Sequence, residues 1–218
     1  MPKDTFLHLT TEKKESFVHA CAMQFAMYNY EKASLSKVVT DLKMAKGSIY
    51  QYFENKKDIY EYLIEVCRQK RKPYIQQVFD NMPELLKDVL KLYLIQELKF
   101  AINEPISFKL LQNIYDEKFS KDIGNKGTHF ILKNMDFIRG MIERDMMKGI
   151  IFPEIEIHLL SYMVANIQIR FIEYVFMKYN LDYNYIYTTT KLKKHIKMSE
   201  VDIIAEQFAN FVYKGIKN

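Results

Sequence analysis

The side chains in this sequence that are best suited to binding a polyanion are concentrated in one short stretch. It offers a cation, a hydroxyl, an amide and two phenols, in Lys46, Ser48, Gln51, Tyr50 and Tyr52. Cations, hydroxyls and phenols bind the phosphate oxygens of DNA, whereas an amide can pair with a base edge. Gly47, which has no side chain, would let the backbone approach a groove closely. This set of groups indicates a DNA-binding segment.

The apolar residues around this set have the spacing of two short helices that brace each other. Their shared core would consist of Val38, Val39, Leu42, Ile49 and Phe53. Ser34 has the side chain of an N-cap for the first helix, and Lys46 would begin the second. Residues 43–45 would form the turn that sets one helix across the other. The stretch from Ser34 to Lys56 therefore predicts a helix-turn-helix and the start of the helix that follows it.

The stretch AKGSIYQYFENKKDIY resembles the recognition helix and the following helix of the TetR family of transcription regulators. The family motif runs approximately Ser-Lys-Gly-Thr-Leu-Tyr-x-Tyr-Phe-x-x-Lys. The residues that match it are Lys46, Gly47, Tyr50, Tyr52, Phe53 and Lys56, with conservative matches at Ser48 and Ile49. The resemblance is sharp over residues 17–63.

Two positions depart from the family pattern. The family's turn usually has Ala-Gly where this chain has Leu42 and Lys43, and Ala45 stands where a Ser or Thr usually begins the recognition helix. If the turn has a left-handed conformation, its free energy is therefore higher with Lys43 than with glycine. Ala45 removes a side-chain cap.

The resemblance implies a role for each residue of the motif. Bases in the major groove would be faced by Lys46, Gly47, Ser48, Tyr50 and Gln51. Phosphates would be bound by Tyr52, Lys56 and Ser34 or Ser36. We expect Gln51 to set the sequence preference, because its amide can pair bidentately with adenine. The alternative interpretation is structural, with tyrosines that pack and lysines that form a solvated face.

The rest of the chain is expected to be helical, since only 6 Gly and 5 Pro occur among 218 residues. The periodicity predicts a helix from Thr11 to residue 33, and another that is capped by Asn55 and ends near Pro73. Further helices are predicted from Pro83 to residue 103, over 106–119, over 131–149 after a break at Gly124–Gly127, over 154–179 and over 201–213. The predicted fold is all-α with about nine helices. A helix-turn-helix DNA-binding domain of three helices would occupy residues 1–54, and a helical ligand-binding and dimerisation domain would occupy residues 55–218.

The size of the second domain indicates a function in addition to DNA binding. We expect it to bind an unidentified small effector, apolar or amphipathic. The candidate ligand-binding residues are Tyr93, Phe100, Tyr115, Phe137, Met141, Asn166 and Arg170. The helices near 154–180 and 200–216 are expected to join two copies as a four-helix bundle. Such a homodimer would bind a palindromic operator on double-stranded DNA, as a repressor does, and the effector would release it.

Two alternatives remain at this point: a helical partner-binding protein, and an architectural DNA-binding protein without an effector. The outward polar set between residues 46 and 52 argues against the first. The charge distribution bears on the second. Residues 1–72 hold 13 Lys and Arg against 9 Asp and Glu, a net charge of +4 out of the chain's +5. The nearly neutral remainder is a large part that DNA binding alone does not require.

Other classes of function lack a sequence signature. The five histidines are scattered, and there is no His-Glu-x-x-His, Gly-x-Ser-x-Gly or phosphate-loop motif, so we expect no catalytic residue, no metal and no cofactor. Cys21 and Cys67 are far apart and are expected to be buried free thiols. The most apolar stretch, residues 157–169, is shorter than the about 20 residues that span a bilayer. With no export signal at its start, the chain is expected to be cytoplasmic and to bind no membrane.

Overall fold

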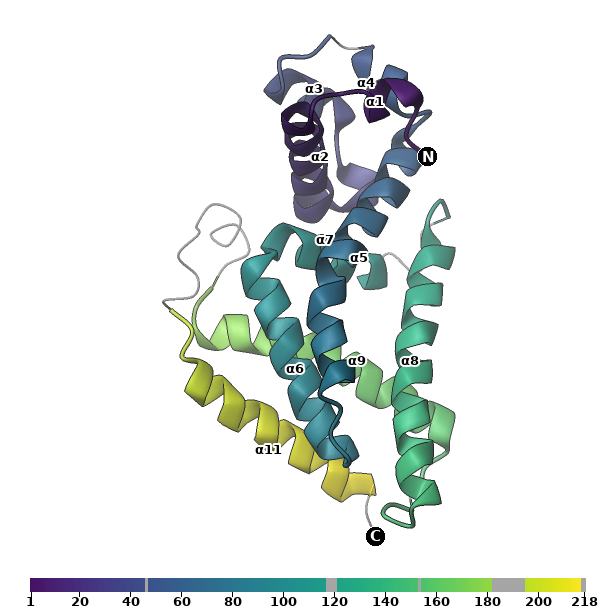
Figure 1. Ribbon diagram of the computed structural model, residues 1–218, viewed down its shortest axis with the longest axis vertical. Helices are drawn as coiled ribbons and strands as arrows, with labels where there is room; N and C mark the ends of the chain where they lie inside the picture. Colours follow the sequence, from purple (N-terminus) through teal and green to yellow (C-terminus); the bar gives the residue numbers. More distant parts are fainter. Residues whose placement is uncertain (46, 117–120, 153, 182–194, 217–218) are drawn as a thin grey trace. The chain divides into compact units, whose positions relative to one another are not determined.

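The computed structural model describes residues 1–45, 47–116, 121–152, 154–181 and 195–216 (Figure 1). Every regular element within these ranges is a helix, which confirms the predicted all-α class. The first half of the chain forms α1 (Asp4–Leu7), α2 (Thr11–Lys32), α3 (Leu35–Asp41), α4 (Ser48–Tyr52) and α5 (Lys56–Asp80). The second half forms α6 (Leu86–Asn103), α7 (Pro105–Asp116), α8 (Gly124–Met147), α9 (Ile157–Lys178) and α11 (Met198–Ile216). No helix within the described residues is long and apolar enough to cross a membrane.

The helices pack into two compact units. The first consists of Met1–Arg71 and Glu104–Gly127, and the second of Lys72–Asn103 and Thr128–Asn218. The division therefore falls within α5, and α7 packs with the first unit. It differs from the functional boundary that the sequence predicts after residue 54, and that functional boundary stays a prediction.

An aromatic cluster forms the core of the first unit next to α4. Phe6, Phe17 and Phe53 are almost completely buried. The rings of Phe17 and Phe53 are stacked with 5.9 Å between their centroids, and Phe6 lies 5.0 Å from Phe53. Such ring pairs contribute about 0.5–1.5 kcal/mol beyond simple burial. The cluster joins α1 and α2 to the residue directly after α4, so the position of this short helix depends on tertiary packing.

A kink in α2 lies next to the contact between α2 and α7. Asn29 has non-helical backbone with a φ of 58°, and its side chain accepts a hydrogen bond from the N–H of Lys32 at 3.2 Å. The carbonyl groups of Phe25 and Ala26, just before the kink, accept hydrogen bonds from the side-chain amide of Asn113 at 2.9 and 3.1 Å. Because Asn113 is buried, these bonds fix α7 against α2.

The core of the second unit is formed by α6, α8, α9 and α11. Its buried apolar residues include Leu86, Val89, Leu90, Ile138, Ile142, Val164 and Val212. Asp145 of α8 is completely buried, and its carboxylate accepts a hydrogen bond from the N–H of Leu86 at 2.9 Å. The guanidinium of Arg144 binds the same carboxylate at 2.9 Å and also donates to the carbonyl of Glu84 at 2.6 Å. This pair holds the start of α6.

The predicted end of the helix near Pro73 is wrong, because α5 continues to Asp80. Proline inside a helix costs about 3 kcal/mol, since it lacks an N–H and its ring collides with the preceding turn. The residues that follow it offset this cost: Val78 is completely buried, and Tyr74 packs against Phe100 with 5.5 Å between the rings. Packing of the second half of α5 thus overrides the local signal.

Two other predicted boundaries are also wrong. Pro83 does not lie in the first turn of a helix, because α6 begins at Leu86, where Asp145 supplies the cap. The expected break at Gly124–Gly127 is replaced by the start of α8. Glycine in a helix costs about 1 kcal/mol, which the burial of apolar residues farther along α8 offsets.

Candidate nucleic-acid interface

The turn between α3 and α4 has a left-handed residue at its centre. α3 ends in a Schellman motif, in which the N–H of Met44 donates to the carbonyl of Val39 at 2.9 Å and the N–H of Lys43 donates to the carbonyl of Thr40 at 3.1 Å. Lys43 accordingly has a φ of 53°. A residue with a side chain pays about 1–2 kcal/mol for this conformation. Lys43 therefore makes this turn less stable than glycine would at the same position.

α4 has one buried side and one exposed side. Ile49 is 1% exposed and Phe53, directly after the helix, is 0% exposed. Tyr50 is 55% exposed, and Gln51 is also exposed. The division between an inward apolar set and an outward polar set therefore agrees with the predicted helix-turn-helix. The outward residues are available to a partner of this unit.

The backbone at the start of α4 is open. α4 begins at Ser48, two residues later than predicted, and the N–H of Ser48 donates to the carbonyl of Ala45 at 2.9 Å. No side chain caps the helix, because its N-cap position is Gly47 and not Ala45 as the sequence predicts. A Cβ added to Gly47 would meet no atom within 4 Å, and the φ of −85° at this residue is ordinary. The fold itself thus has no need of glycine here. Lys46 lies outside the described residues.

The residues predicted to bind phosphates surround α3 and the start of α5. Ser34 and Ser36 are exposed, and the hydroxyl of Ser34 accepts a hydrogen bond from the N–H of Lys37 at 3.3 Å, which confirms the predicted cap. The ammonium of Lys56 donates to the carbonyl of Glu31 at 3.1 Å. Lys56 therefore ties α5 to the end of α2. Phosphate binding by these side chains stays a prediction.

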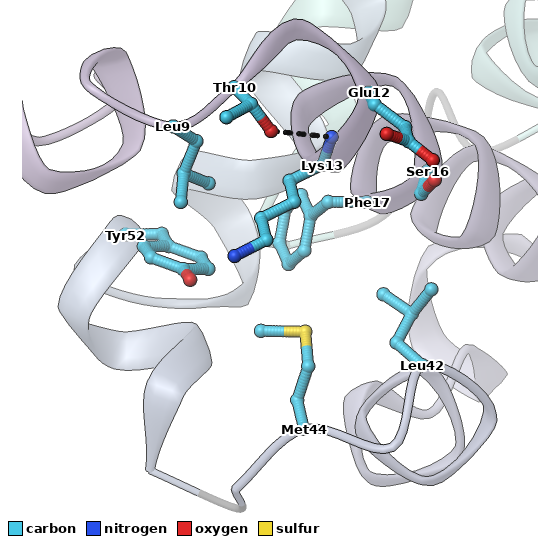
Figure 2. A pocket seen from close by; sticks show the side chains of 9 residues that line it. All are labelled: Leu9, Thr10, Glu12, Lys13, Ser16, Phe17, Leu42, Met44 and Tyr52. Carbon is cyan, nitrogen blue, oxygen red and sulfur yellow. Dashed lines mark hydrogen bonds between the residues drawn. The ribbon is translucent and has the colours of Figure 1, made fainter.

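Beside α4, a hollow of about 370 Å³ opens between the start of α2 and the turn (Figure 2). Its apolar lining consists of Leu9, Phe17, Leu42, Met44 and Tyr52, and its polar lining of Thr10, Glu12, Lys13 and Ser16. Figure 2 shows Lys13 extending across the hollow toward Tyr52. Tyr52 is held by a T-shaped contact with Phe17 at 5.6 Å. A cation and a phenol thus lie together beside α4, and the sequence analysis did not select Lys13.

The contacts between α1 and α4 were also missed by the sequence analysis. The ammonium of Lys3 donates to the carbonyl of Tyr50 at 2.9 Å, and its backbone N–H donates to the carbonyl of Tyr52 at 2.9 Å. The hydroxyl of Thr5 donates to the carbonyl of Gln51. Bonds to backbone carbonyls leave no trace in side-chain periodicity. The sequence did contain one signal. A single phenylalanine precedes the first predicted helix, and such a large apolar side chain is expected to be buried.

The seven predicted ligand-binding residues are divided between the two units. Tyr93, Phe137 and Met141 share one apolar cluster of the second unit, with 6.1 Å between the rings of Tyr93 and Phe137. Phe100 is completely buried elsewhere in that unit, and Tyr115 belongs to the first unit. The structure thus brings three of the seven together. Their role in binding a ligand stays a prediction.

The other two candidate ligand residues lie on α9 and contact that helix itself. The amide of Asn166 donates to the carbonyl of Tyr162 at 2.7 Å. Arg170 is exposed, and its guanidinium binds the carboxylate of Glu173 at 2.8 and 3.0 Å. Arg170 and Glu173 therefore neutralise each other on the outer side of α9.

Both cysteines are buried free thiols, as the sequence predicts. Burial raises the pKa of Cys21 to about 12 and that of Cys67 to about 11. Both thiols are consequently protonated at neutral pH, which makes them poor nucleophiles. Within the described ranges, no group of three or more His, Cys, Asp or Glu side chains could hold a metal ion.

The helix-turn-helix and the complete fold both have known relatives. Residues 17–63 match the family described as bacterial regulatory proteins, tetR family. A TetR-family transcriptional regulator from Chloroflexus aurantiacus has a similar structure, with a TM-score of 0.84 and 18% identity over 100% of this chain and 99% of that chain. Residues 17–63 thus match the tetR family, and the chain as a whole shares the fold of a TetR-family regulator. This family is made up of DNA-binding transcriptional regulators, and the matched residues contain α3, the turn and α4.

Two further similar proteins are described as transcriptional regulators. The HTH-type transcriptional regulator YhgD of Bacillus subtilis is 19% identical over 150 residues, which are 66% of this chain and 75% of that protein. The transcriptional regulator FadR of Bacillus subtilis, solved in complex with stearoyl-CoA, has a TM-score of 0.64 and 16% identity over 93% of this chain and 98% of that chain. At such identities the structural similarity shows a shared TetR-type fold.

Proposed function

We propose that this TetR-family chain controls transcription as a homodimer that reads an operator with α4 and leaves the DNA when a small molecule binds. The observation that carries the proposal is the division of α4 into a buried side, with Ile49 and Phe53, and an exposed side, with Tyr50 and Gln51. A polar helix face that the unit leaves uncovered can enter the major groove of B-DNA. The open backbone at Gly47 supports a close approach of that face.

The exposed side chains would divide the recognition of DNA between them. Gln51 would pair with a base, because an amide offers a donor and an acceptor side by side, as adenine does. Tyr50 and Ser48 would add contacts to the groove, and Lys46 would add a positive charge. Ser34 or Ser36, Tyr52 and Lys56 would bind phosphates at the edges of the site. Phosphate contacts position a protein on the duplex, while base contacts select the sequence.

The DNA-binding proposal is tested by selection of bound duplexes from a randomised library with the complete chain, followed by sequencing. We expect an inverted repeat whose half-sites are separated by about one or more helical turns of 34–36 Å, and an affinity that falls steeply with salt. Gln51→Ala should relax the discrimination between selected and random duplexes. Gln76→Ala, an exposed glutamine of the second unit, is the matched control. A library without enrichment, or binding without salt dependence, refutes the proposal.

The dimer proposal is based on the exposed apolar side chains of α9 and α11. Those of α9 include Leu159, Tyr162, Met163, Ile167, Tyr174 and Met177, and those of α11 include Ile203 and Phe211. The opposite sides of both helices are buried in the second unit, so α9 is apolar on nearly all sides. Both helices pack against α6, and one ring contact joins them, with 5.9 Å between the rings of Phe171 and Phe208. Two adjacent helices with exposed apolar faces fit a four-helix bundle with a second copy.

Light scattering at micromolar concentration tests the dimer. Twice the chain mass of 26.1 kDa is expected for the wild type. Phe211→Glu should produce the monomer, since Phe211 is 75% exposed in the single chain and a charge at the centre of an apolar interface is costly. Phe152→Glu, at a residue 57% exposed outside α9 and α11, should remain dimeric. A monomeric wild type refutes the dimer.

The effector proposal is supported by the size of the second unit and by the contact between α7 and α2. A signal that reaches α7 would be passed to α2 of the DNA-binding part through the bonds of Asn113 to Phe25 and Ala26. The FadR complex with stearoyl-CoA suggests the first probe. Release requires that the effector bind the DNA-free form more tightly than the DNA-bound form.

Fluorescence anisotropy of the selected operator tests the effector. Stearoyl-CoA should lower the affinity of the chain for the operator, whereas coenzyme A alone, which lacks the apolar part, should not. Release of the operator would relieve repression. An operator affinity that is unchanged at saturating stearoyl-CoA would rule out long-chain acyl-CoA as the effector.

A further inference from the structure

We infer that the α1 segment, residues 3–7, belongs to the DNA-reading unit because it sets the position of α4. Lys3 and Thr5 are the positioning residues. Figure 1 shows α1 beside α4 in the first unit. The inference rests on the proposed reading of DNA by α4. It adds residues outside the helix-turn-helix, and outside the matched range 17–63, to those that determine recognition.

The hydrogen bonds of the last four carbonyl groups of α4 carry the inference. A helix leaves these groups without partners of its own, and α4 has only five residues. The carbonyl of Ile49 accepts from the N–H of Phe53 at 3.0 Å. The next three carbonyls accept from the α1 segment: Tyr50 from the ammonium of Lys3, Gln51 from the hydroxyl of Thr5, and Tyr52 from the N–H of Lys3. The end of α4 is thus completed by a different part of the chain.

The α1 segment is itself fixed to the core, so its bonds to α4 connect two ordered parts. Phe6 is 1% exposed and lies 5.6 Å from Phe17 and 5.0 Å from Phe53. The ammonium of Lys3 also pairs with the carboxylate of Glu54 at 2.8 Å. A positive charge at this end of α4 is favourable, because the carbonyl end of a helix carries partial negative charge.

These bonds act on the residues that would read the DNA. The carbonyls of Tyr50 and Gln51 belong to two exposed candidates for base contacts, so movement of the backbone would move both side chains. A helix of five residues is not stable by itself in water. Loss of the α1 bonds should therefore loosen α4 and reduce discrimination between operators, without removing any group that touches DNA.

Hydrogen–deuterium exchange of the DNA-free chain tests the hold of α1 on α4. Thr5→Val keeps the shape of the side chain and removes the hydroxyl that donates to Gln51. We expect the amides of residues 50–53 to exchange severalfold faster in this variant. Thr40→Val is the matched control, because it removes an equivalent hydroxyl bond to the carbonyl of Ser36 on α3. Thr40→Val should leave the exchange of residues 50–53 unchanged.

Operator binding tests the consequence for recognition. Lys3→Met should weaken binding to the selected operator on the order of tenfold, as expected for loss of a hydrogen bond from a charged group, and weaken binding to random duplex much less. Lys3→Arg, which keeps donors at the same place, should restore most of the affinity. Lys70→Met removes the same charge from a lysine that pairs with Glu104 and contacts neither α1 nor α4. It should weaken both duplexes slightly and equally.

Three results separate the possibilities. Wild-type exchange of residues 50–53 and wild-type discrimination in both Thr5→Val and Lys3→Met overturn the inference. Equal losses in Lys3→Met and Lys70→Met also overturn it, because charge alone would then explain the effect. If the wild type selects no duplex, the proposed function fails, and the exchange experiment still decides whether α1 holds α4.

Discussion

Replacing Lys43 with glycine is expected to stabilise the chain. Lys43 has a φ of 53° at the end of α3, where two backbone hydrogen bonds require the left-handed conformation. A residue with a side chain pays about 1–2 kcal/mol there. Glycine avoids this cost but loses about 0.5–1 kcal/mol more conformational entropy on folding. The difference predicts a gain of about 0.5–1 kcal/mol in the free energy of unfolding.

Urea unfolding followed by circular dichroism measures this gain. The midpoint should rise while the slope stays constant, because the surface exposed on unfolding is unchanged. Lys43→Ala is the matched control: it removes the ammonium but keeps the Cβ that causes the strain, so its free energy of unfolding should stay near that of the wild type. If alanine stabilises as much as glycine, charge removal is the cause. If glycine destabilises, the argument from the left-handed turn is refuted.

Three further predictions test the site and its support. Gly47→Ala should change the free energy of unfolding by less than about 0.5 kcal/mol, because the new Cβ meets no atom, yet weaken operator binding about tenfold; equal binding would show that no groove wall lies near Gly47. Asp145→Ala should cost about 2–4 kcal/mol in urea unfolding, because it removes the buried acceptor of the Leu86 N–H and the anion that the partly exposed Arg144 binds, whereas Asp136→Ala, which breaks an exposed pair on the same helix, should cost less than about 1 kcal/mol; equal costs would contradict the assigned burial. Burial raises the pKa of both thiols from 9.0, to about 12 for Cys21 and about 11 for Cys67, so the unfolded chain releases their protons first. The free energy of unfolding should therefore fall above pH 9 by up to about 1.4 kcal/mol per pH unit for each thiol; Cys21→Ala should reduce this slope, and an unchanged slope would refute the assignment.

The sequence predicted best those features that depend on neighbouring residues. The cap of α3 by Ser34 follows from one side chain and an amide three residues later. The cap by Asn55 is of the same kind, since its side chain accepts from the N–H of Asp58 at 2.9 Å. The inward and outward sides of α4 follow from spacing within a few residues. Such signals are complete within one turn of a helix, so they can be interpreted without knowing the fold.

Features that depend on distant partners were not predictable in this way. Lys56 belongs to the family motif, and its ammonium nevertheless bonds to the carbonyl of Glu31, twenty-five residues earlier. Lys3 looks like an ordinary exposed lysine ahead of the first helix, yet it completes the end of α4. A proline signal at residue 73 was overridden because the following side chains are buried in the second unit. In each case tertiary packing determined the structure, because local conformational propensity contributes less free energy than packing does.

The place of α7 shows why the division of the chain could not be predicted from sequence. In a continuous helix the carbonyls of Phe25 and Ala26 would accept from the N–H groups of residues 29 and 30. The non-helical backbone of Asn29 redirects the chain after this residue, where the N–H of residue 30 lies, and a buried carbonyl that lacks a donor is costly. Any amide, hydroxyl or ammonium in the chain could supply the missing donor, and the sequence contains many. Only the fold selects Asn113, and this choice places α7 in the same unit as the helix-turn-helix.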